Sequence, residues 1–225
     1  MFGTSPSGYN SVRQGLPKPD TSVFGFLFGK IGVVKRITFV TSNKGKYSSA
    51  KRFLKKYGIT VIQRDAEIPE SRGNLEEIAV HKARHAFKLI KEPLIVMDAG
   101  FFIPSLNGFP MMFTNFVLET IGNEGILKLV KGEDRTCRFK EVLCYHEGGH
   151  KKPRLFKRFV EGTIASRPRG RVKPYHWSKL ALIFIPKGEK KTMAEMTDRE
   201  FAAFRKTVDN RSHWEQFGKF YSKLN

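Results

Sequence analysis

The chain has few of the features that mark secreted, membrane-spanning or disordered proteins. Only two of its 225 residues are cysteine, which excludes a secreted scaffold built on disulfides. No apolar run approaches the roughly 18 residues that a membrane span needs. Acidic residues are scarce, 21 against 41 Lys and Arg, and the net charge of +20 predicts a polyanionic partner. Hydrophobic residues still make up 40%, which excludes a disordered chain.

The two cysteines predict free thiols. Cys137 and Cys144 lie seven residues apart in one expected strand. That spacing puts them on opposite faces, roughly 23 Å apart, which is too far for a disulfide. We therefore expect buried thiols and a reducing compartment.

The scarce acids leave two separate basic regions. From residue 1 to 64 the only acid is Asp20, and from 151 to 173 it is Glu161. Residues 1–34 are rich in Ser, Gly and Pro and carry no secretory hydrophobic segment, which predicts a basic, largely irregular N-terminal extension. The sequence excludes secretion and leaves both the mitochondrion and the cytoplasm open as destinations.

Hydrophobic periodicity from residue 35 onward predicts an α/β domain over 35–225. Strands are expected at 36–41, 59–63, 94–97, 136–145, 155–165 and 180–185, and helices at 44–57, 74–91, 113–121, 124–130, 198–206 and 210–223. A strand–helix–strand start followed by hairpin-like strands indicates a mixed sheet.

Two strand ends carry polar residues suited to phosphate chemistry. Thr41 to Lys46 (TSNKGK) joins a strand to a helix and offers backbone N–H groups to an anion, although an ordinary capped turn fits as well. Asp98 ends an apolar strand before a Gly turn, where it suits Mg²⁺ binding, proton transfer or simply backbone capping. His81 and His85 share a helix face with Glu77, for which a solvated face is favoured over a metal site.

Six sequence blocks together resemble the inosine/xanthosine triphosphate pyrophosphatases, especially their archaeal branch. They are FVTSNKGK (39–46), GNLEEIAVHKA (73–83), PLIVMDAGFFIPSLNGFP (93–110), ETIGNEGILKLVKG (119–132), LIFIP (182–186) and TMAEMT (192–197). The resemblance covers about 35–224. It implies a two-lobed mixed sheet flanked by helices around a central cleft.

The resemblance also implies a reaction, in which water attacks the α-phosphorus of a purine nucleoside triphosphate and Mg²⁺ holds the phosphates. Glu77 and Asp98 would then be metal carboxylates, and Asp98 and Lys46 would be the catalytic residues. A homodimer is common in this family. The implied phosphate-binding set is Thr41, Ser42, Asn43, Lys44, Lys46 and Arg211.

Several family features are missing at their matched positions. Met97 stands where the family has a second acid, and Met111 replaces a small Gly. The aromatic–Asp motif that grips the base falls on Leu180 and Ala181. The family's Ser-His-Arg falls on residues 209–211, where only Arg211 matches.

Two functional hypotheses follow. The preferred one is a catalytically degenerate protein of this fold that binds RNA through its basic arm and loop, as part of a ribonucleoprotein such as a cytoplasmic or mitochondrial ribosome. The alternative is an active Mg²⁺-dependent pyrophosphatase with altered base preference. The expected nucleic-acid-binding residues are Arg13, Lys18, Lys30, Arg167, Arg169, Arg171, Lys173 and Trp177.

Overall fold

The computed structural model describes residues 35–69, 71, 73–176 and 178–224. The predicted extension 1–34 lies outside these ranges, so a domain boundary at residue 34 stays a prediction. Within the described ranges, no helix combines the length and apolar character that a membrane span requires.

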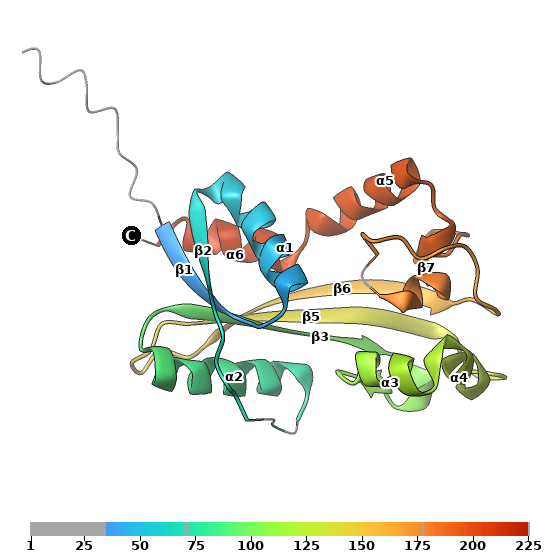
Figure 1. Cartoon of the computed structure of the whole chain (residues 1–225), viewed down its shortest axis with the longest axis horizontal. Coiled ribbons are helices and arrows are strands. Elements are labelled where there is room, and N and C mark those ends of the chain that lie inside the picture. Colours follow the sequence, from blue (N-terminus) through green and yellow to red (C-terminus); the bar gives the residue numbers. More distant parts are fainter. Residues whose placement is uncertain (1–34, 70, 72, 177, 225) are drawn as a thin grey trace, which may run out of the picture. The chain divides into compact units, whose positions relative to one another are not determined.

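The described residues form a seven-stranded mixed sheet flanked by helices, which confirms the predicted fold class (Figure 1). The strand order is β2-β1-β3-β5-β6-β7, with the short β4 (Pro110–Met111) paired to β3. β1 (Lys35–Val40) is parallel to β2 (Ile59–Arg64) and to β3 (Leu94–Phe102). From β3 onward the pairing is antiparallel, with β5 (Thr136–His146) beside β3, β6 (Arg154–Ile164) beside β5 and β7 (Phe184–Pro186) beside β6.

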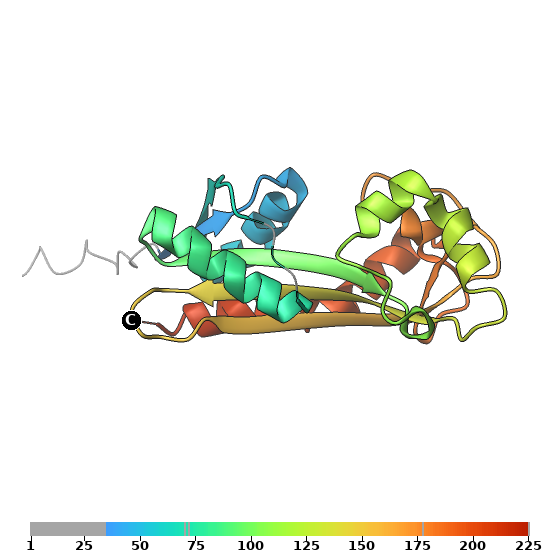
Figure 2. The same cartoon turned by 90° about the horizontal axis from the view of Figure 1, so that it is seen from below.

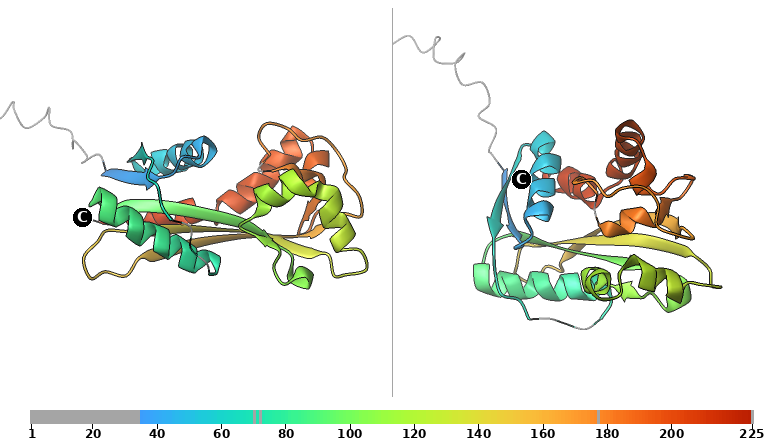
Figure 3. Two further views of the ribbon diagram at one scale, coloured as in Figure 1. Left: turned by 60° about the horizontal axis from the view of Figure 1, so that its bottom comes forward. Right: turned by 45° about the vertical axis from the view of Figure 1, so that its right-hand side comes forward.

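Helices cover both faces of the sheet (Figures 2 and 3). α1 (Lys44–Leu54) and α6 (His213–Tyr221) pack on one face against Phe39 and Leu143. α2 (Leu75–Ile90) packs on the other face, against Val96 and Val142. A separate apolar cluster at the other end of the sheet joins α3 (Thr114–Thr120), α4 (Gly122–Leu129), α5 (Asp198–Asp209) and β7.

Local capping signals explain where two of these helices begin and end. Asn74 accepts a hydrogen bond from the backbone of Glu77, and the Glu77 carboxylate accepts one from the Asn74 backbone, a reciprocal capping box that starts α2. The helical run from α1 ends in a 3-10 turn (Lys55–Tyr57) closed by Gly58 at φ +68°.

The prediction of buried free thiols is confirmed, and the reducing compartment stays a prediction. Cys137 and Cys144 are buried free thiols of β5 in different apolar clusters. Burial raises the pKa of the Cys144 thiol to about 12 and raises that of Cys137 as well. Both side chains are therefore neutral packing groups.

Two strand predictions are wrong. β3 does not stop at Met97 but continues to Phe102, because β5 pairs with it along its whole length, so Asp98 lies in mid-strand. The expected strand 180–185 begins with a 3-10 turn (Lys179–Leu182), and only Phe184–Pro186 is extended. Leu180 and Ala181 have no exposed surface in the apolar cluster of this end.

Candidate active site

A pocket of about 240 Å³ lies where β1 and β3 separate. The two strands pair only at Thr38–Leu94 and Phe39–Ile95. Beyond that point β3 no longer pairs with β1 and pairs with β5 and, at its end, with β4. The turn after β1 and the middle of β3 therefore border a gap at the carboxyl end of β1. This is the kind of position at which open α/β sheets bind ligands.

The turn after β1 is held by its own side chains. Asn43 caps α1, because its amide oxygen accepts from the Lys46 backbone N–H at 2.9 Å. The Asn43 N–H donates to the Thr41 hydroxyl at 3.1 Å. The backbone N–H groups of Lys44 and Gly45 have no acceptor among the described residues. These donors lie at the positive end of an eleven-residue helix whose cap, Asn43, lines the pocket, a position that suits an anion.

Two lysines approach the pocket from opposite faces of the sheet. Lys46 comes from α1, and its ammonium donates to the Met97 carbonyl at 2.9 Å. Lys82 comes from α2, and its ammonium lies 2.7 Å from Oδ1 of Asp98. Burial lowers the pKa of Lys46, and the nearby Asp98 carboxylate partly opposes that shift.

Asp98 is the buried carboxylate of this pocket. Its side chain is 13% exposed, and Oδ2 has no hydrogen-bond partner within the described part of the chain. A buried carboxylate oxygen without a partner is costly unless something else occupies it, such as a cation or a water molecule. Asp65, directly after β2, lines the same pocket and adds a second, exposed carboxylate.

The predicted site residues are only partly brought together. Thr41, Ser42, Asn43, Lys46 and Asp98 line the pocket. Glu77 does not line it, because its carboxylate caps α2. Arg211 is exposed and also lies outside the lining, and Lys44 is exposed on the first turn of α1.

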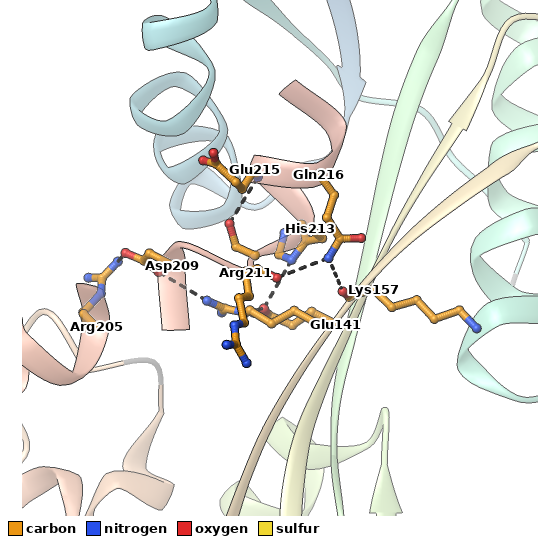
Figure 4. Close-up of polar contacts among 10 residues, drawn as sticks. Glu141, Lys157, Arg205, Asp209, Arg211, His213, Glu215 and Gln216 are labelled. Carbon is orange, nitrogen blue, oxygen red and sulfur yellow. Dashed lines mark hydrogen bonds and ion pairs between the residues drawn. The ribbon is translucent and has the colours of Figure 1, made fainter. Parts of the chain in front are cut away.

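A buried charged cluster on the α6 side of the sheet was missed by sequence reasoning (Figure 4). Glu141 and Arg158 stand opposite each other in the β5–β6 register, and the Arg158 guanidinium donates to the Glu141 carboxylate. Arg158 also lies 3.4 Å from Asp209 at the end of α5. Two positions on adjacent strands cannot be matched until the register is known.

His213 borders this cluster with no exposed surface, and its Nδ1 lies 3.5 Å from Glu141. Burial lowers the pKa of His213 to about 3, so its imidazole is neutral near pH 7. Ser212 and His213 repeat the first two residues of the Ser-His-Arg motif, three positions after the match made by sequence. Ser212 caps α6, which places His213 at the first turn.

The basic segment 167–173 has fewer unpaired positive charges than its sequence predicts. Arg169 lies 3.4 Å from the Glu195 carboxylate, and Lys173 pairs with Asp198. Arg167 and Arg171 are exposed. Arg13, Lys18, Lys30 and Trp177 lie outside the described residues. His81 and His85 have ring centres 6.3 Å apart, and no cluster of three or more metal-binding side chains occurs in the ranges described.

The family model described as the Ham1 family matches residues 37–207. The chain belongs to the Ham1 family. It is 44% identical to a dITP/XTP pyrophosphatase of Methanopyrus kandleri over 163 residues, 72% of this chain and 84% of that protein. It is 38% identical to a dITP/XTP pyrophosphatase of Thermococcus kodakarensis over 167 residues, 73% of this chain and 87% of that protein.

Solved structures agree on the fold. A HAM1 protein from Coxiella burnetii matches with a TM-score of 0.70 at 23% identity, covering 84% of this chain and 100% of the other. The Staphylococcus aureus Ham1 protein matches with a TM-score of 0.66 at 24% identity, covering 83% and 97%. The resemblance inferred from the six sequence blocks is thereby confirmed, including its archaeal character.

Proposed function

We propose that this Ham1-family chain is an active, magnesium-dependent nucleoside-triphosphate pyrophosphatase, which converts an NTP to its monophosphate and pyrophosphate. The observation that carries the proposal is the pocket at the separation of β1 and β3. There, two lysines and a buried carboxylate with a free oxygen meet beside the N-terminus of α1. Archaeal relatives called dITP/XTP pyrophosphatases, at 38–44% identity, support the same activity.

The polar edge of the pocket suits a triphosphate. The free N–H groups of Lys44 and Gly45 lie in the first turn of α1, where they can donate hydrogen bonds to phosphate oxygens. Lys46 and Lys82 add two cations from opposite faces of the sheet. Because Lys46 is buried, its interaction with a phosphate oxygen is less screened by water than that of a surface lysine.

Asp98 can orient the attacking water and accept its proton. Oδ1 accepts a hydrogen bond from Lys82, which fixes the orientation of the carboxylate and leaves Oδ2 free to accept one from the water. The water oxygen forms a bond to the α-phosphorus while the bond to the bridging oxygen breaks. Pyrophosphate leaves, and the proton of the water passes to Asp98.

The donor set of the pocket fits Mg²⁺. Asp65 offers carboxylate oxygens, and Thr41 and Ser42 offer hydroxyls, all of which are hard oxygen ligands, while Oδ2 of Asp98 is kept for the proton of the water. When bound there, Mg²⁺ would neutralise phosphate charge and polarise the reacting phosphorus. Glu77 does not take part in this arrangement, because its carboxylate is engaged in the cap of α2.

Base recognition is expected to be weak. Leu180 and Ala181 stand where the family carries its base-gripping aromatic and acid, and both are fully buried in the apolar cluster around β7. They present neither a ring nor a carboxylate to a purine. A site without hydrogen-bonding partners discriminates poorly between bases. We therefore propose that ITP, XTP and GTP are cleaved with similar kcat/KM.

The proposal is tested by pyrophosphate release. Purified protein is incubated with Mg²⁺ and, in turn, ITP, XTP, GTP and ATP, alongside the variants Asp98→Asn and Glu133→Gln. Glu133 is an exposed acid with no ion pair in the described part of the chain, so its variant controls for the loss of one charge. We expect turnover in the wild type and in Glu133→Gln, and a loss of about 100-fold or more in Asp98→Asn. Equal rates in all three proteins would refute the proposal.

The hypothesis of a degenerate, RNA-binding protein is less well supported. One of the lost features is restored, because a Ser-His pair is present at Ser212 and His213. Within the basic loop, Arg169 and Lys173 interact with carboxylates of the chain itself. RNA binding, a homodimer and the mitochondrial or cytoplasmic location stay predictions.

A further inference from the structure

A second pocket, of about 340 Å³, lies between α2 and the turn that joins β5 to β6. It shares no lining residue with the candidate active site, although both pockets touch α2. Its principal side chains are Arg84, Phe87, Lys88, His146, Lys151 and Lys152.

The charge of this pocket is of one sign. Arg84 and Lys88 are four residues apart and share a face of α2, while Lys151 and Lys152 come from the opposing turn. No acidic side chain lines the pocket. Lys151 has a partner in Glu147 at 2.8 Å, whereas Arg84, Lys88 and Lys152 have no ion-pair partner among the described residues.

Backbone packing holds the turn against α2. Gly148 adopts φ +84°, and a Cβ atom added there would lie 2.0 Å from the Phe87 ring. The Phe87 and His146 rings pack edge to face with centroids 5.0 Å apart. The turn therefore packs directly against the Phe87 ring. This close packing holds the cations of the turn near those of α2.

His146 also lines the pocket, and one of its ring nitrogens is unpaired among the described residues. Its residue is 7% exposed, and its Nδ1 has no hydrogen-bond partner within the described ranges. A buried ring nitrogen without a partner costs free energy of the order of 1–3 kcal/mol. A polar ligand in the pocket would recover part of that cost once the ring adjusts toward it.

We propose that this second pocket binds a phosphate-bearing ligand. Phosphate combines high negative charge with several acceptor oxygens, which matches three unpaired cations around one cavity. The volume lies near the lower end of the roughly 300–1,000 Å³ of small-molecule sites, which suits one nucleotide unit or a short polyphosphate. The ligand is either a free phosphate compound or one unit of an RNA strand, and the two sources share the same chemistry.

The test uses two probes on full-length protein that carries Lys46→Gln, so that phosphate binding at the candidate active site is weakened. Inorganic pyrophosphate is titrated by calorimetry, and a short labelled single-stranded oligoribonucleotide is titrated by fluorescence anisotropy. The test variant is Arg84→Gln/Lys88→Gln. The matched control is Lys128→Gln/Lys131→Gln, which removes two exposed lysines at and after the end of α4, at the opposite end of the sheet (Figures 1 and 2).

We expect the Arg84/Lys88 variant to lose about tenfold or more in affinity for at least one probe, because hydrogen bonds to charged groups are worth roughly 1.5–3 kcal/mol. The control should change by less than about twofold. Loss for pyrophosphate alone identifies a free phosphate compound, and any loss for the oligoribonucleotide identifies a strand. Equal losses in both double variants, or no loss in either, would overturn the proposal.

Measurements of NTP hydrolysis distinguish this pocket from the candidate active site. In a background with Lys46 intact, Arg84→Gln/Lys88→Gln should retain wild-type kcat and KM for NTP hydrolysis. A second readout is the amide signals of Gly148 and Gly149, which should shift with pyrophosphate in Lys46→Gln protein. Unchanged glycine signals at saturating pyrophosphate and oligoribonucleotide would also contradict the proposal.

Discussion

Lys82 Nζ lies 2.7 Å from Asp98 Oδ1, while Oδ2 of the same carboxylate has no partner in the described part of the chain. The two residues come from α2 and from the middle of β3, so one lysine orients the acid and leaves a single oxygen for catalysis. Replacing Lys82 should therefore weaken catalysis even though the Asp98 carboxylate itself remains.

We expect Lys82→Gln to lower kcat/KM for NTP hydrolysis by roughly 10- to 100-fold, since a hydrogen bond between charged groups contributes about 1.5–3 kcal/mol. The urea midpoint should fall as well, because Lys82→Gln leaves the Asp98 carboxylate, 13% exposed, without its ion-pair partner. Steady-state kinetics beside an unfolding curve measures both effects. Lys82→Arg is the matched control, and it should retain more activity than Lys82→Gln. A wild-type kcat/KM in Lys82→Gln would show that Asp98 needs no such support.

The lowered pKa of Lys46 predicts that KM for NTP hydrolysis rises at high pH, which gives the pH profile of KM a basic limb. Because burial lowers its pKa from the usual 10.5, its ammonium loses its proton at a lower pH than an exposed lysine does. KM should therefore begin to rise below pH 10.5 as the positive charge at the phosphate site is lost. Lys46→Arg keeps the charge, since arginine stays protonated, and should move this limb to higher pH. An identical limb in both proteins would assign the titration to another group.

His213 predicts loss of stability in mild acid. Its pKa is about 3 in the folded protein and near 6.5 when unfolded, so the unfolded state binds more protons between those values. The free energy of unfolding should fall as pH drops through this window, by at most about 1.4 kcal/mol per pH unit for this group. His146 and His176, whose pKa values burial also lowers, act in the same direction.

Urea unfolding of wild type and His213→Gln between pH 6.5 and 5.5 measures this contribution. Carboxylates stay largely ionised in both the folded and the unfolded state over that interval, and the other histidines are common to both proteins. His213→Gln should flatten the pH dependence relative to wild type, whatever its effect on stability at pH 7. Parallel slopes in the two proteins would mean that His213 is not buried as a neutral group.

A double-mutant cycle should measure a favourable coupling energy between Glu141 and Arg158. Arg158→Met leaves the Glu141 carboxylate, 19% exposed in its side chain, without its main cation, and should cost about 3 kcal/mol of stability. Glu141→Leu combined with Arg158→Met removes both charges and should recover most of that loss. Urea unfolding of the four proteins gives the coupling energy. Additive losses would show that the two side chains act independently.

Met111 carries backbone strain that glycine would relieve. Its φ is +55°, in the left-handed region, and its residue is 38% exposed, so its side chain contributes little packing. We expect Met111→Gly to stabilise the fold by about 0.5–1 kcal/mol, measured by thermal unfolding. Met112 has no positive φ and packs on the apolar cluster of α2, so Met112→Gly should destabilise. Destabilisation by both changes would mean that Met111 is not strained.

The elements that sequence could predict are those with local signals. Asn74 and Gly58 mark the start of α2 and the end of the run from α1, and alternation along 136–145 and 155–165 indicates the β5–β6 hairpin. These signals act within a few residues and need no knowledge of the tertiary fold. The polar turn at 41–46 is predictable for the same reason.

The sequence predictions fail where tertiary contacts determine the role of a residue. Asp98 was placed at a strand end because Gly100 follows it. The close approach of the Met111 carbonyl, 2.6 Å from where a Cβ would sit, gives that glycine a role inside the sheet instead. The place of His213 beside Glu141 could not be predicted, because it depends on the packing of α6 against β5. The second carboxylate of the pocket, Asp65, follows β2, and only the parallel pairing of β1 with β2 brings it to the site.

The central claim is tested most directly by hydrolysis of ITP in ¹⁸O-labelled water with Mg²⁺, followed by mass analysis of the products. The site predicts inosine monophosphate and pyrophosphate, with the label on the monophosphate, because water attacks the α-phosphorus. It also predicts that Asp98→Asn forms neither product at a comparable rate. Release of inosine diphosphate and phosphate, or no turnover above that of Asp98→Asn, would contradict the account.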